Sequence, residues 1–251
     1  MDARLVAHFP RTAHYDAKWV RDHSLGENVL YNTESLCEVL PLARNMRVLD
    51  LGCGHAISSI FLAKEFGVHV VAVDSTISER ENLGRVCDMG CLGRVIPVRE
   101  RAERLDFPNS FFDAIIAIDV IHFVGATRRF LPRVLRWLKP GGRIGIVDAF
   151  VKQKLRRHEE APPHLRPLFS RIWSWLHPIR TWEQLWSRSS QLRIECAEEI
   201  PQSDLIRSAY IEEKRCVIGE APIVKAIEQD RGQFISLMRM VAQKISNAAP
   251  D

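Results

Sequence analysis

The sequence lacks any long run of apolar residues. Its longest such stretches, of which residues 114–118 are an example, fall far short of the roughly 20 residues that a bilayer-spanning helix needs. The first residues, MDARLVAHFPRTAHYD, contain no apolar core of the kind found in signal peptides. We therefore expect a cytoplasmic protein without a membrane span.

The cysteine spacings of a metal site or a disulfide framework are also missing. Six cysteines are scattered along the chain, and the nearest pair, Cys87 and Cys91, does not have the CxxC spacing. No histidine is close enough in the sequence to complete a zinc site. We expect six reduced thiols and no bound metal.

The chain also lacks a large excess of positive or negative charge. The 35 Lys and Arg residues exceed the 31 Asp and Glu residues by only four. The basic residues form short clusters, such as 128–129 and 154–157, which are usually solvated surfaces. This distribution argues against a nucleic-acid partner. A hydrophobic fraction of 46% and a charged fraction of 26% are typical of a globular protein.

What the sequence does contain is a regular alternation of aliphatic runs and helical patterns. The runs that predict strands are 47–51, 68–73, 95–98, 113–118 and 143–148. The segments that predict helices are 17–22, 34–40, 57–66, 78–89 and 126–138, with Asn32 and Thr33 as the cap of the second. Continuous aliphatic strands between helices indicate a parallel sheet covered on both faces. We predict a doubly wound α/β unit over residues 30–150.

In such sheets ligands bind beyond the carboxyl ends of the strands. The first predicted strand ends in the turn Gly52-Cys53-Gly54, and Ile57 stands where a dinucleotide fingerprint requires its third glycine. Asp50 precedes the turn, and its charge would repel a pyrophosphate. A ligand with an ammonium group beside a carboxylate fits better, because amides at the helix N-terminus can hold the carboxylate.

An acidic residue also ends the second predicted strand. Asp74 occupies the position at which a carboxylate accepts hydrogen bonds from the two hydroxyls of a ribose. Together with the glycine turn and its preceding acid, Asp74 predicts a ligand that has an amino-acid end and a ribose end.

Four segments, in this order, resemble the motifs of class I S-adenosylmethionine-dependent methyltransferases. They are 48–54, 71–74, 105–115 and 138–143. The resemblance implies a Rossmann-like fold with a mostly parallel seven-stranded sheet, S-adenosylmethionine as the cofactor, and transfer of its methyl group. It also implies that Asp50 and the turn Gly52-Cys53-Gly54 hold the methionine end of the cofactor and that Asp74 holds the ribose.

The same resemblance assigns the adenine. It implies that Ser75 lies beside the ring and that Ala102 and Glu103 present groups to its edge. Two positions depart from the family pattern: Ala56 replaces a glycine, and Arg101 replaces an aspartate that accepts from the adenine amino group. Arginine cannot accept a hydrogen bond, so that contact falls to Glu103 or to the backbone, or is missing.

Residues after the fourth predicted strand are candidates for catalysis. Methyl transfer depends mainly on alignment, and a base helps when the nucleophile must lose a proton. His122 is of the residue type that titrates near neutral pH, so a base and a substrate-positioning group are equal hypotheses for it. Asp119 is expected to contact the amino end of the cofactor or to brace the loop.

Tryptophan is concentrated in one segment: Trp173, Trp175, Trp182 and Trp186. The last two share a helical face and are expected to pack on the sheet. The residues predicted to wall a pocket for a small, largely apolar or aromatic metabolite are Trp19, Phe123, Trp173, Trp175 and His177. The sequence has no Asp/Asn-Pro-Pro-Tyr/Phe motif for a flipped base and no appended nucleic-acid-binding domain.

We expect four parts of the chain. They are an N-terminal helical cap (1–45), the cofactor-binding core (46–150), a helical substrate lid (151–190) and a segment that completes the sheet (191–251). In the last part, 202–230 is predicted to be helical and 234–244 to be an antiparallel strand. A protein or RNA methyltransferase, and a fold member that binds the cofactor without methyl transfer, stay open as alternatives. The oligomeric state is open between monomer and homodimer.

Overall fold

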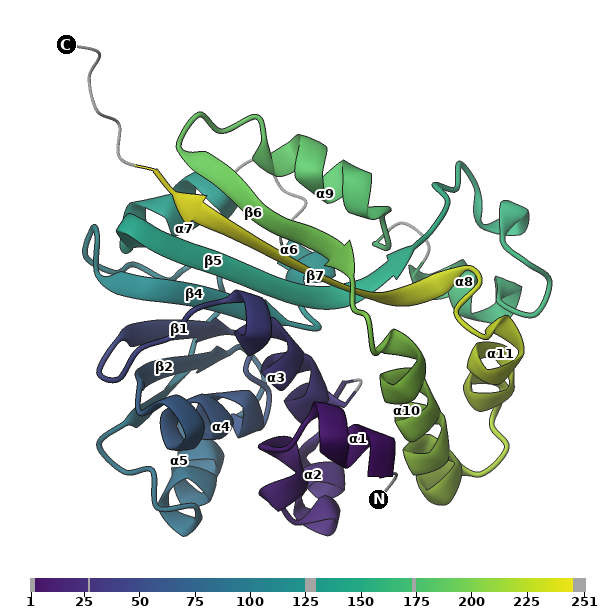
Figure 1. Ribbon diagram of the computed structural model, residues 1–251, viewed down its shortest axis with the longest axis horizontal. Coiled ribbons are helices and arrows are strands. Elements are labelled where there is room, and N and C mark those ends of the chain that lie inside the picture. Colours follow the sequence, from purple (N-terminus) through teal and green to yellow (C-terminus); the bar gives the residue numbers. More distant parts are fainter. Residues whose placement is uncertain (1–2, 27, 125–129, 173–174, 246–251) are drawn as a thin grey trace.

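The computed structural model describes residues 3–26, 28–124, 130–172 and 175–245. In this part of the chain a seven-stranded sheet with the order β3-β2-β1-β4-β5-β7-β6 forms the centre of the molecule (Figure 1). The strands are β1 (Arg47–Leu51), β2 (His69–Asp74), β3 (Val95–Arg99), β4 (Phe112–Ile118), β5 (Leu138–Val151), β6 (Leu192–Glu199) and β7 (Ile235–Lys244).

Strand directions follow the predicted pattern. β1 to β5 pair in parallel, and β7 runs antiparallel to both β5 and β6. The structure therefore confirms the doubly wound, mostly parallel sheet and its last antiparallel strand. It adds β6, an edge strand that the search for continuous aliphatic runs did not find.

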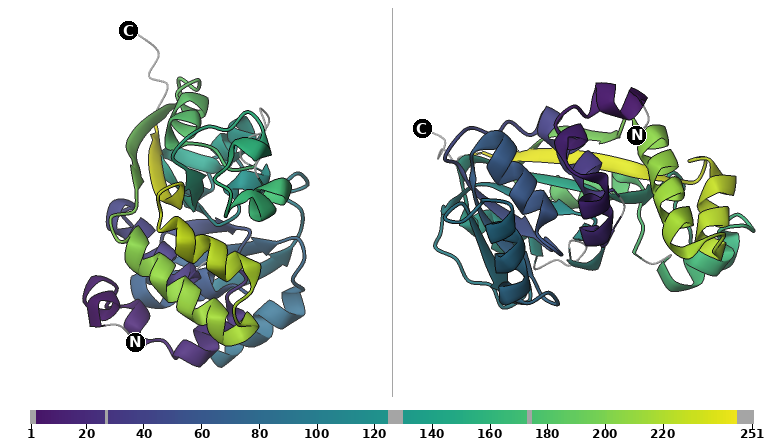
Figure 2. Two further views of the ribbon diagram at one scale, coloured as in Figure 1. Left: turned by 90° about the vertical axis from the view of Figure 1, so that its right-hand side faces the viewer. Right: turned by 90° about the horizontal axis from the view of Figure 1, so that it is seen from below.

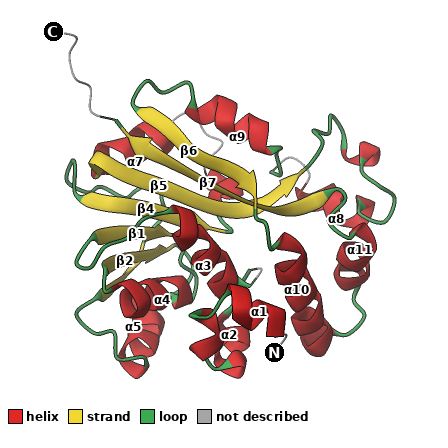
Figure 3. Ribbon diagram, viewed as in Figure 1, coloured by secondary structure: helices red, strands yellow, loops and turns green. Residues whose placement is uncertain are grey.

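Helices cover both faces of the sheet. They are α1 (Ala3–His8), α2 (Ala17–His23), α3 (Val29–Val39), α4 (Ile57–Phe66), α5 (Glu79–Asp88), α6 (Ile121–Val124), α7 (Phe130–Trp137), α8 (Arg166–Ile172), α9 (Ile179–Trp186), α10 (Ser203–Ile218) and α11 (Pro222–Asp230), with short 3-10 turns at Thr12–His14 and His158–Glu160. Figure 3 shows α3 and α4 on one side of the sheet and α7 and α9 on the other.

Two hydrophobic cores result from this layering. Successive strand residues point to opposite faces, so Val48 packs in the core under α3 and α4, while Leu49 packs in the core under α7 and α9. Both residues are fully buried. Because both faces of β1 are covered, the turn that follows it is held in place from two sides.

The tryptophans of α9 belong to the second core. Trp182 and Trp186 are 2% and 0% exposed, and both pack against the sheet. This confirms the prediction that they fix their helix to the sheet. Residues 179–186 are thus part of the cover of the sheet.

The start of α3 differs from the prediction. The helix begins at Val29, and its N-cap is Asn28, which has a left-handed φ of 38°. The side chain of Asn28 donates a 2.6 Å hydrogen bond to the carbonyl of Ile206 in α10. The predicted cap at Asn32 and Thr33 is wrong, because this tertiary contact extends the helix by a turn.

α10 and α11 confirm the predicted helical segment 202–230. The two helices pack against each other, and α10 lies beside the N-terminal helix α1 (Figure 2). No helix among the described residues has both the length and the apolar composition to cross a bilayer.

Candidate active site

The turn after β1 forms one wall of a cavity of about 350 Å³. Gly52 and Gly54 have φ values of 73° and 52°, in the left-handed region that favours glycine. A Cβ at Gly52 would lie 2.5 Å from the side chain of Val120, and one at Gly54 would lie 3.1 Å from Leu25. A larger residue at either position would therefore displace a wall of the cavity.

Ala56 stands where the family pattern has a glycine, and its backbone conformation shows how the chain accommodates this change. It is the N-cap of α4 and has a φ of 59°, so the backbone keeps the left-handed conformation that glycine would adopt there. Alanine can occupy this region at a cost of roughly 1–2 kcal/mol. The turn thus keeps its shape without its third small residue being glycine.

Asp74 lies beside this turn at the end of β2. Its Oδ2 accepts the backbone N–H of Gly54 at 3.0 Å, and its Oδ1 accepts the backbone N–H of Thr76 and Ile77. Burial opposes ionisation of the carboxyl, but these hydrogen bonds outweigh it and hold the pKa of Asp74 below its ordinary value. Asp74 is therefore an anion that fixes the turn and faces the cavity.

Asp50 lies deeper than its neighbours in the sequence. It is 1% exposed, and its Oδ2 accepts hydrogen bonds from the hydroxyls of Ser58 and Ser59, both at 2.6 Å. Its Oδ1 has no hydrogen-bond partner among the described residues. Burial raises the pKa of Asp50 to about 6, although the hydrogen bonds from the two serines act in the opposite direction. Asp50 does not line the cavity, whereas Ser58, which it holds, does.

A second hollow of about 330 Å³ continues from the first. The two share Gly52, Asp74 and Val120, so they are adjacent along the ends of β1 and β2. The residues predicted from the sequence to bind the cofactor line one hollow or both, with the exception of Asp50: Gly52, Cys53, Gly54, Asp74, Ser75, Ala102, Glu103 and Asp119.

His122 forms a pair with a carboxylate that sequence reasoning missed. Its Nδ1 lies 2.7 and 2.9 Å from the two oxygens of Asp148, and its backbone N–H donates to Asp148 at 3.1 Å. Asp148 is 1% exposed and lies on β5, next to β4. A carboxylate that accepts from Nδ1 fixes the tautomer in which Nε2 carries the lone pair. The pair therefore fixes the orientation of the His122 ring at the edge of the cavity.

Asp119 is held in an unusual backbone conformation. Its φ is 54°, and its backbone N–H donates to Val147 at 2.8 Å. A Cβ at Gly26 would lie 1.9 Å from its Oδ2, so the loop before α3 lies directly against this carboxylate. Donor atoms of Asp119, His122 and Asp148 all lie within 4.8 Å of one another, which is also compatible with a metal ion.

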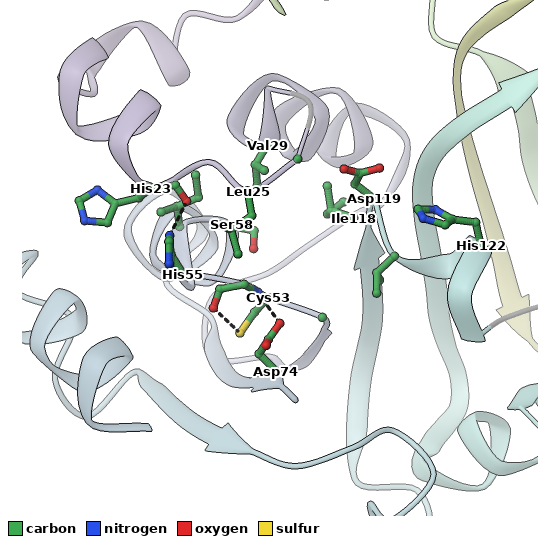
Figure 4. Close-up of a pocket in the computed structure, with 15 residues that line it drawn as sticks. His23, Leu25, Val29, Cys53, His55, Ser58, Asp74, Ile118, Asp119 and His122 are labelled. Atoms are coloured by element: carbon green, nitrogen blue, oxygen red, sulfur yellow. Dashed lines mark hydrogen bonds between the residues drawn. The ribbon is translucent and has the colours of Figure 1, made fainter. Parts of the chain in front are cut away.

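The cavity has further walls that sequence reasoning did not identify. Figure 4 shows Asp119 and His122 on one side and His23 and His55 on the other. The Nδ1 of His55 lies 3.1 Å from the carbonyl oxygen of His23, which joins α2 to the glycine turn. Burial and the charge of Arg85 lower the pKa of His55.

The predicted substrate residues fall into three groups. Trp175 is 39% exposed and stacks on His122, with ring centroids 6.2 Å apart. Trp19 packs on His23 and His177 on Trp182, and neither lines the cavity. Trp173 and the side chain of Phe123 lie outside the described residues. Of the five, the structure brings Trp175 to the catalytic histidine candidate.

The doubly wound sheet, with a glycine turn after β1 and an acidic residue at the end of β2, is a Rossmann-like architecture. The family model described as a methyltransferase domain matches residues 48–142. This match covers the first three of the four motifs that resemble class I S-adenosylmethionine-dependent methyltransferases, and nearly all of the fourth.

Relatives and solved structures agree with this family. The chain is 28% identical over 140 residues to phosphoethanolamine N-methyltransferase 1 of Zea mays, a match that covers 53% of this chain and 26% of that protein. The matched segment thus spans about a quarter of that relative's length.

Two solved structures share the fold over nearly the whole chain. Phosphoethanolamine N-methyltransferase 2 of Haemonchus contortus, in complex with S-adenosyl-L-methionine, superposes with a TM-score of 0.72, 19% identity, and coverage of 98% of this chain and 59% of that chain. A putative sarcosine dimethylglycine methyltransferase of Galdieria sulphuraria gives a TM-score of 0.70, 17% identity, and coverage of 95% and 97%.

Proposed function

We propose that this chain transfers a methyl group from S-adenosylmethionine to a small molecule. One observation carries the proposal: the glycine turn, Asp74 and His122, which is paired with the buried Asp148, line the same cavity. The glycine turn with Asp74 is suited to a cofactor with an amino-acid end and a ribose end, and the histidine pair to proton transfer from an acceptor. Their juxtaposition supports a site in which the cofactor binds and the acceptor loses its proton.

The residues present fit the cofactor. Ile57 and Ser58, the first residues of α4, line the cavity, and the N–H groups in the first turn of a helix can hold a carboxylate. Oδ2 of Asp74 accepts one hydrogen bond and has capacity for a ribose hydroxyl. The unpartnered Oδ1 of Asp50 adds negative potential beneath the turn, which favours an ammonium group. When bound, the cofactor supplies a methyl group on a positively charged sulfur.

His122 accepts the proton that the acceptor loses. Asp148 holds the ring through Nδ1, so Nε2 is the basic atom, and the carboxylate stabilises the charge that forms on the imidazole. Asp119 lines the same cavity, which supports its predicted contact with the amino end of the cofactor. Ser75, Ala102 and Glu103 line the neighbouring hollow, where the adenine fits.

The acceptor is a small, largely apolar or aromatic metabolite. Leu25, Val29 and Ile118 supply apolar walls to the cavity, and Trp175 adds an aromatic ring beside His122. The relatives named above include methyltransferases of phosphoethanolamine, which is also a small molecule. A volume of about 350 Å³ suits such an acceptor better than a folded macromolecule.

Transfer of an isotopically labelled methyl group tests the function. The full chain is incubated with methyl-labelled S-adenosylmethionine and either a small-molecule extract or a protein and RNA extract. We expect label in small molecules. Label in protein or RNA would support the alternative macromolecular substrate, and tight cofactor binding without transfer would show a binding protein.

Variants of the histidine pair test its role. We expect His122→Gln to lower kcat by roughly 10²–10⁴-fold with little change in cofactor affinity. Asp148→Asn removes the negative charge and one of the two acceptor oxygens beside Nδ1, so we expect a similar direction and a smaller loss. If His122 is a base, higher pH restores part of the rate of His122→Gln; a rate that stays flat with pH would identify a positioning group instead.

We further propose that the protein acts in the cytoplasm as a monomer or homodimer. No disulfide joins its six cysteines, all of which lie among the described residues, and reduced thiols are the norm in that compartment. Fractionation of cells that express the chain, and sedimentation of the purified protein, test the two statements separately.

A further inference from the structure

Another cavity lies between the N-terminal helices and α10. Its volume is about 340 Å³, within the range of small-molecule sites. Residues of α1, α2, α3 and α10 line it, and Figure 2 shows α10 beside the N-terminal helices. Among the described residues it shares no lining side chain with the two hollows of the candidate active site. It is therefore a separate site.

A buried hydroxyl on the wall of this cavity has no partner. Thr12 is 3% exposed, and its Oγ1 makes no hydrogen bond with any described residue. Its backbone N–H donates to the carboxylate of Glu34 at 2.7 Å, which fixes the turn that carries it. An unsatisfied buried polar atom costs free energy, which a ligand with a polar group can recover.

The charges that line the cavity are mostly negative. Glu212 and Glu213 supply two carboxylates against the one guanidinium of Arg21. Burial raises the pKa of Glu213, and the charges of Lys214 and Arg21 oppose this shift. The neighbouring Lys214 lies over the ring of Tyr210, with Nζ 5.3 Å from the ring centroid. Glu213 is thus a half-buried carboxylate with cations near it, but no described residue forms a hydrogen bond or an ion-pair contact with it.

We propose that this cavity binds a small molecule that carries an ammonium group on an apolar body. The ammonium pairs with Glu213, and the apolar body packs among Leu5, Val20 and Tyr31. A polar atom of the ligand completes the hydrogen bonding of Thr12. The ligand is chemically distinct from an anionic or uncharged aromatic molecule of the same size.

The site lies close to the candidate active site but does not depend on it. Val20, Arg21 and Tyr31 line this cavity, whereas Leu25 and Val29, from the same stretch of chain, line the cofactor cavity. A failure of the proposed methyl transfer would therefore leave this proposal standing. The experiment is arranged to keep the two apart.

Calorimetric titration with 2-phenylethylammonium chloride tests the site, with and without saturating S-adenosylhomocysteine. We expect the probe to bind at one site per chain under both conditions. Glu213→Gln is expected to weaken binding by at least about tenfold, because a charged hydrogen bond is lost. Asp88→Asn, which removes an exposed carboxylate from α5, is expected to bind as the unaltered chain does.

A second variant guards against a folding effect. Ala209→Leu fills the same cavity from α10 and is expected to block the probe, while thermal unfolding shows whether each variant is folded. The proposal is overturned if the probe does not bind or if Glu213→Gln binds it equally well. It is also overturned if 3-phenylpropionate, a matched anion, binds as tightly, or if S-adenosylhomocysteine displaces the probe.

Discussion

Asp50 is a buried carboxyl group whose ionisation the fold opposes. Its pKa in the folded chain is about 6, raised by burial against the hydrogen bonds of Ser58 and Ser59. In the unfolded chain an aspartate titrates near about 3.9. The folded state therefore binds more protons between these two pH values, so the stability that protonated Asp50 confers is complete below the lower value and is lost as pH rises through the upper one.

Asparagine at position 50 cannot ionise. We therefore expect the stability of Asp50→Asn, relative to that of the unaltered chain, to be greater at neutral than at acidic pH. The difference in free energy of unfolding between the two proteins is expected to shift by about 2 kcal/mol between about pH 4.5 and about pH 7.5. Urea unfolding at both pH values measures it. Equal differences at the two pH values would show that Asp50 keeps an ordinary pKa.

The group of Asp119, His122 and Asp148 permits a test of metal dependence. Both oxygens of Asp148 lie within 2.9 Å of Nδ1 of His122, so this nitrogen is engaged as a donor and is not available as a ligand. We expect dialysis against a chelator to change the rate of methyl transfer by less than about twofold, since base catalysis needs no ion. A loss of activity that added Mg²⁺ or Zn²⁺ restores would contradict the hydrogen-bonded pair.

At the scale of single residues, the sequence predicted the cofactor side of the site better than the catalytic side. Gly52, Gly54 and Asp74 follow strands that are visible as aliphatic runs, and they line the cavity. Asp148 ends such a run too, but its role depends on His122, which is 26 residues earlier. Only the pairing of β4 with β5 brings the two together, and a local pattern does not contain that information.

The loop that joins α2 to α3 acts as an element of the site, because Gly26 lies against Asp119. A Cβ at this position would come 1.9 Å from Oδ2 of Asp119. Overpacking of this kind costs roughly 1–3 kcal/mol, so we expect Gly26→Ala to weaken the binding of S-adenosylhomocysteine by roughly tenfold. Calorimetry of the variant measures this change.

Gly84→Ala is the matched control. Gly84 lies in α5, and a Cβ there would have no neighbour within 4 Å among the atoms of the structure. Alanine is the better helix former, so the free energy of unfolding is expected to rise by up to about 1 kcal/mol with no change in cofactor affinity. If Gly26→Ala and Gly84→Ala bind S-adenosylhomocysteine equally, the loop does not support Asp119.

Elements were predictable where one local signal was strong. β1, β2, β3 and β4 agree with the predicted strands within one residue at each end, because each contains an aliphatic run. β6 was missed because its apolar residues Leu192 and Ile194 alternate with charged residues. An alternating pattern was the signal available for it.

In the whole molecule, the four motifs predicted the fold of the sheet, but they did not predict where α10 packs against the N-terminal helices. The sheet and the cofactor turn follow from the order of the four motifs. The position of α10 against the N-terminal helices follows from contacts such as Asn28 with Ile206, which are 178 residues apart in the sequence. The cavity between the N-terminal helices and α10 exists because of that packing, so sequence patterns alone could not have revealed it.

Titration of the full chain with S-adenosylhomocysteine measures most directly whether the cavity after β1 and β2 is a cofactor site. We expect one site per chain, and an affinity that falls by about 10–100-fold in Asp74→Asn, because a hydrogen bond to a charged group is lost. The exposed substitution Asp88→Asn should leave the affinity unchanged. Absence of binding, or equal affinity in Asp74→Asn, would contradict the assignment.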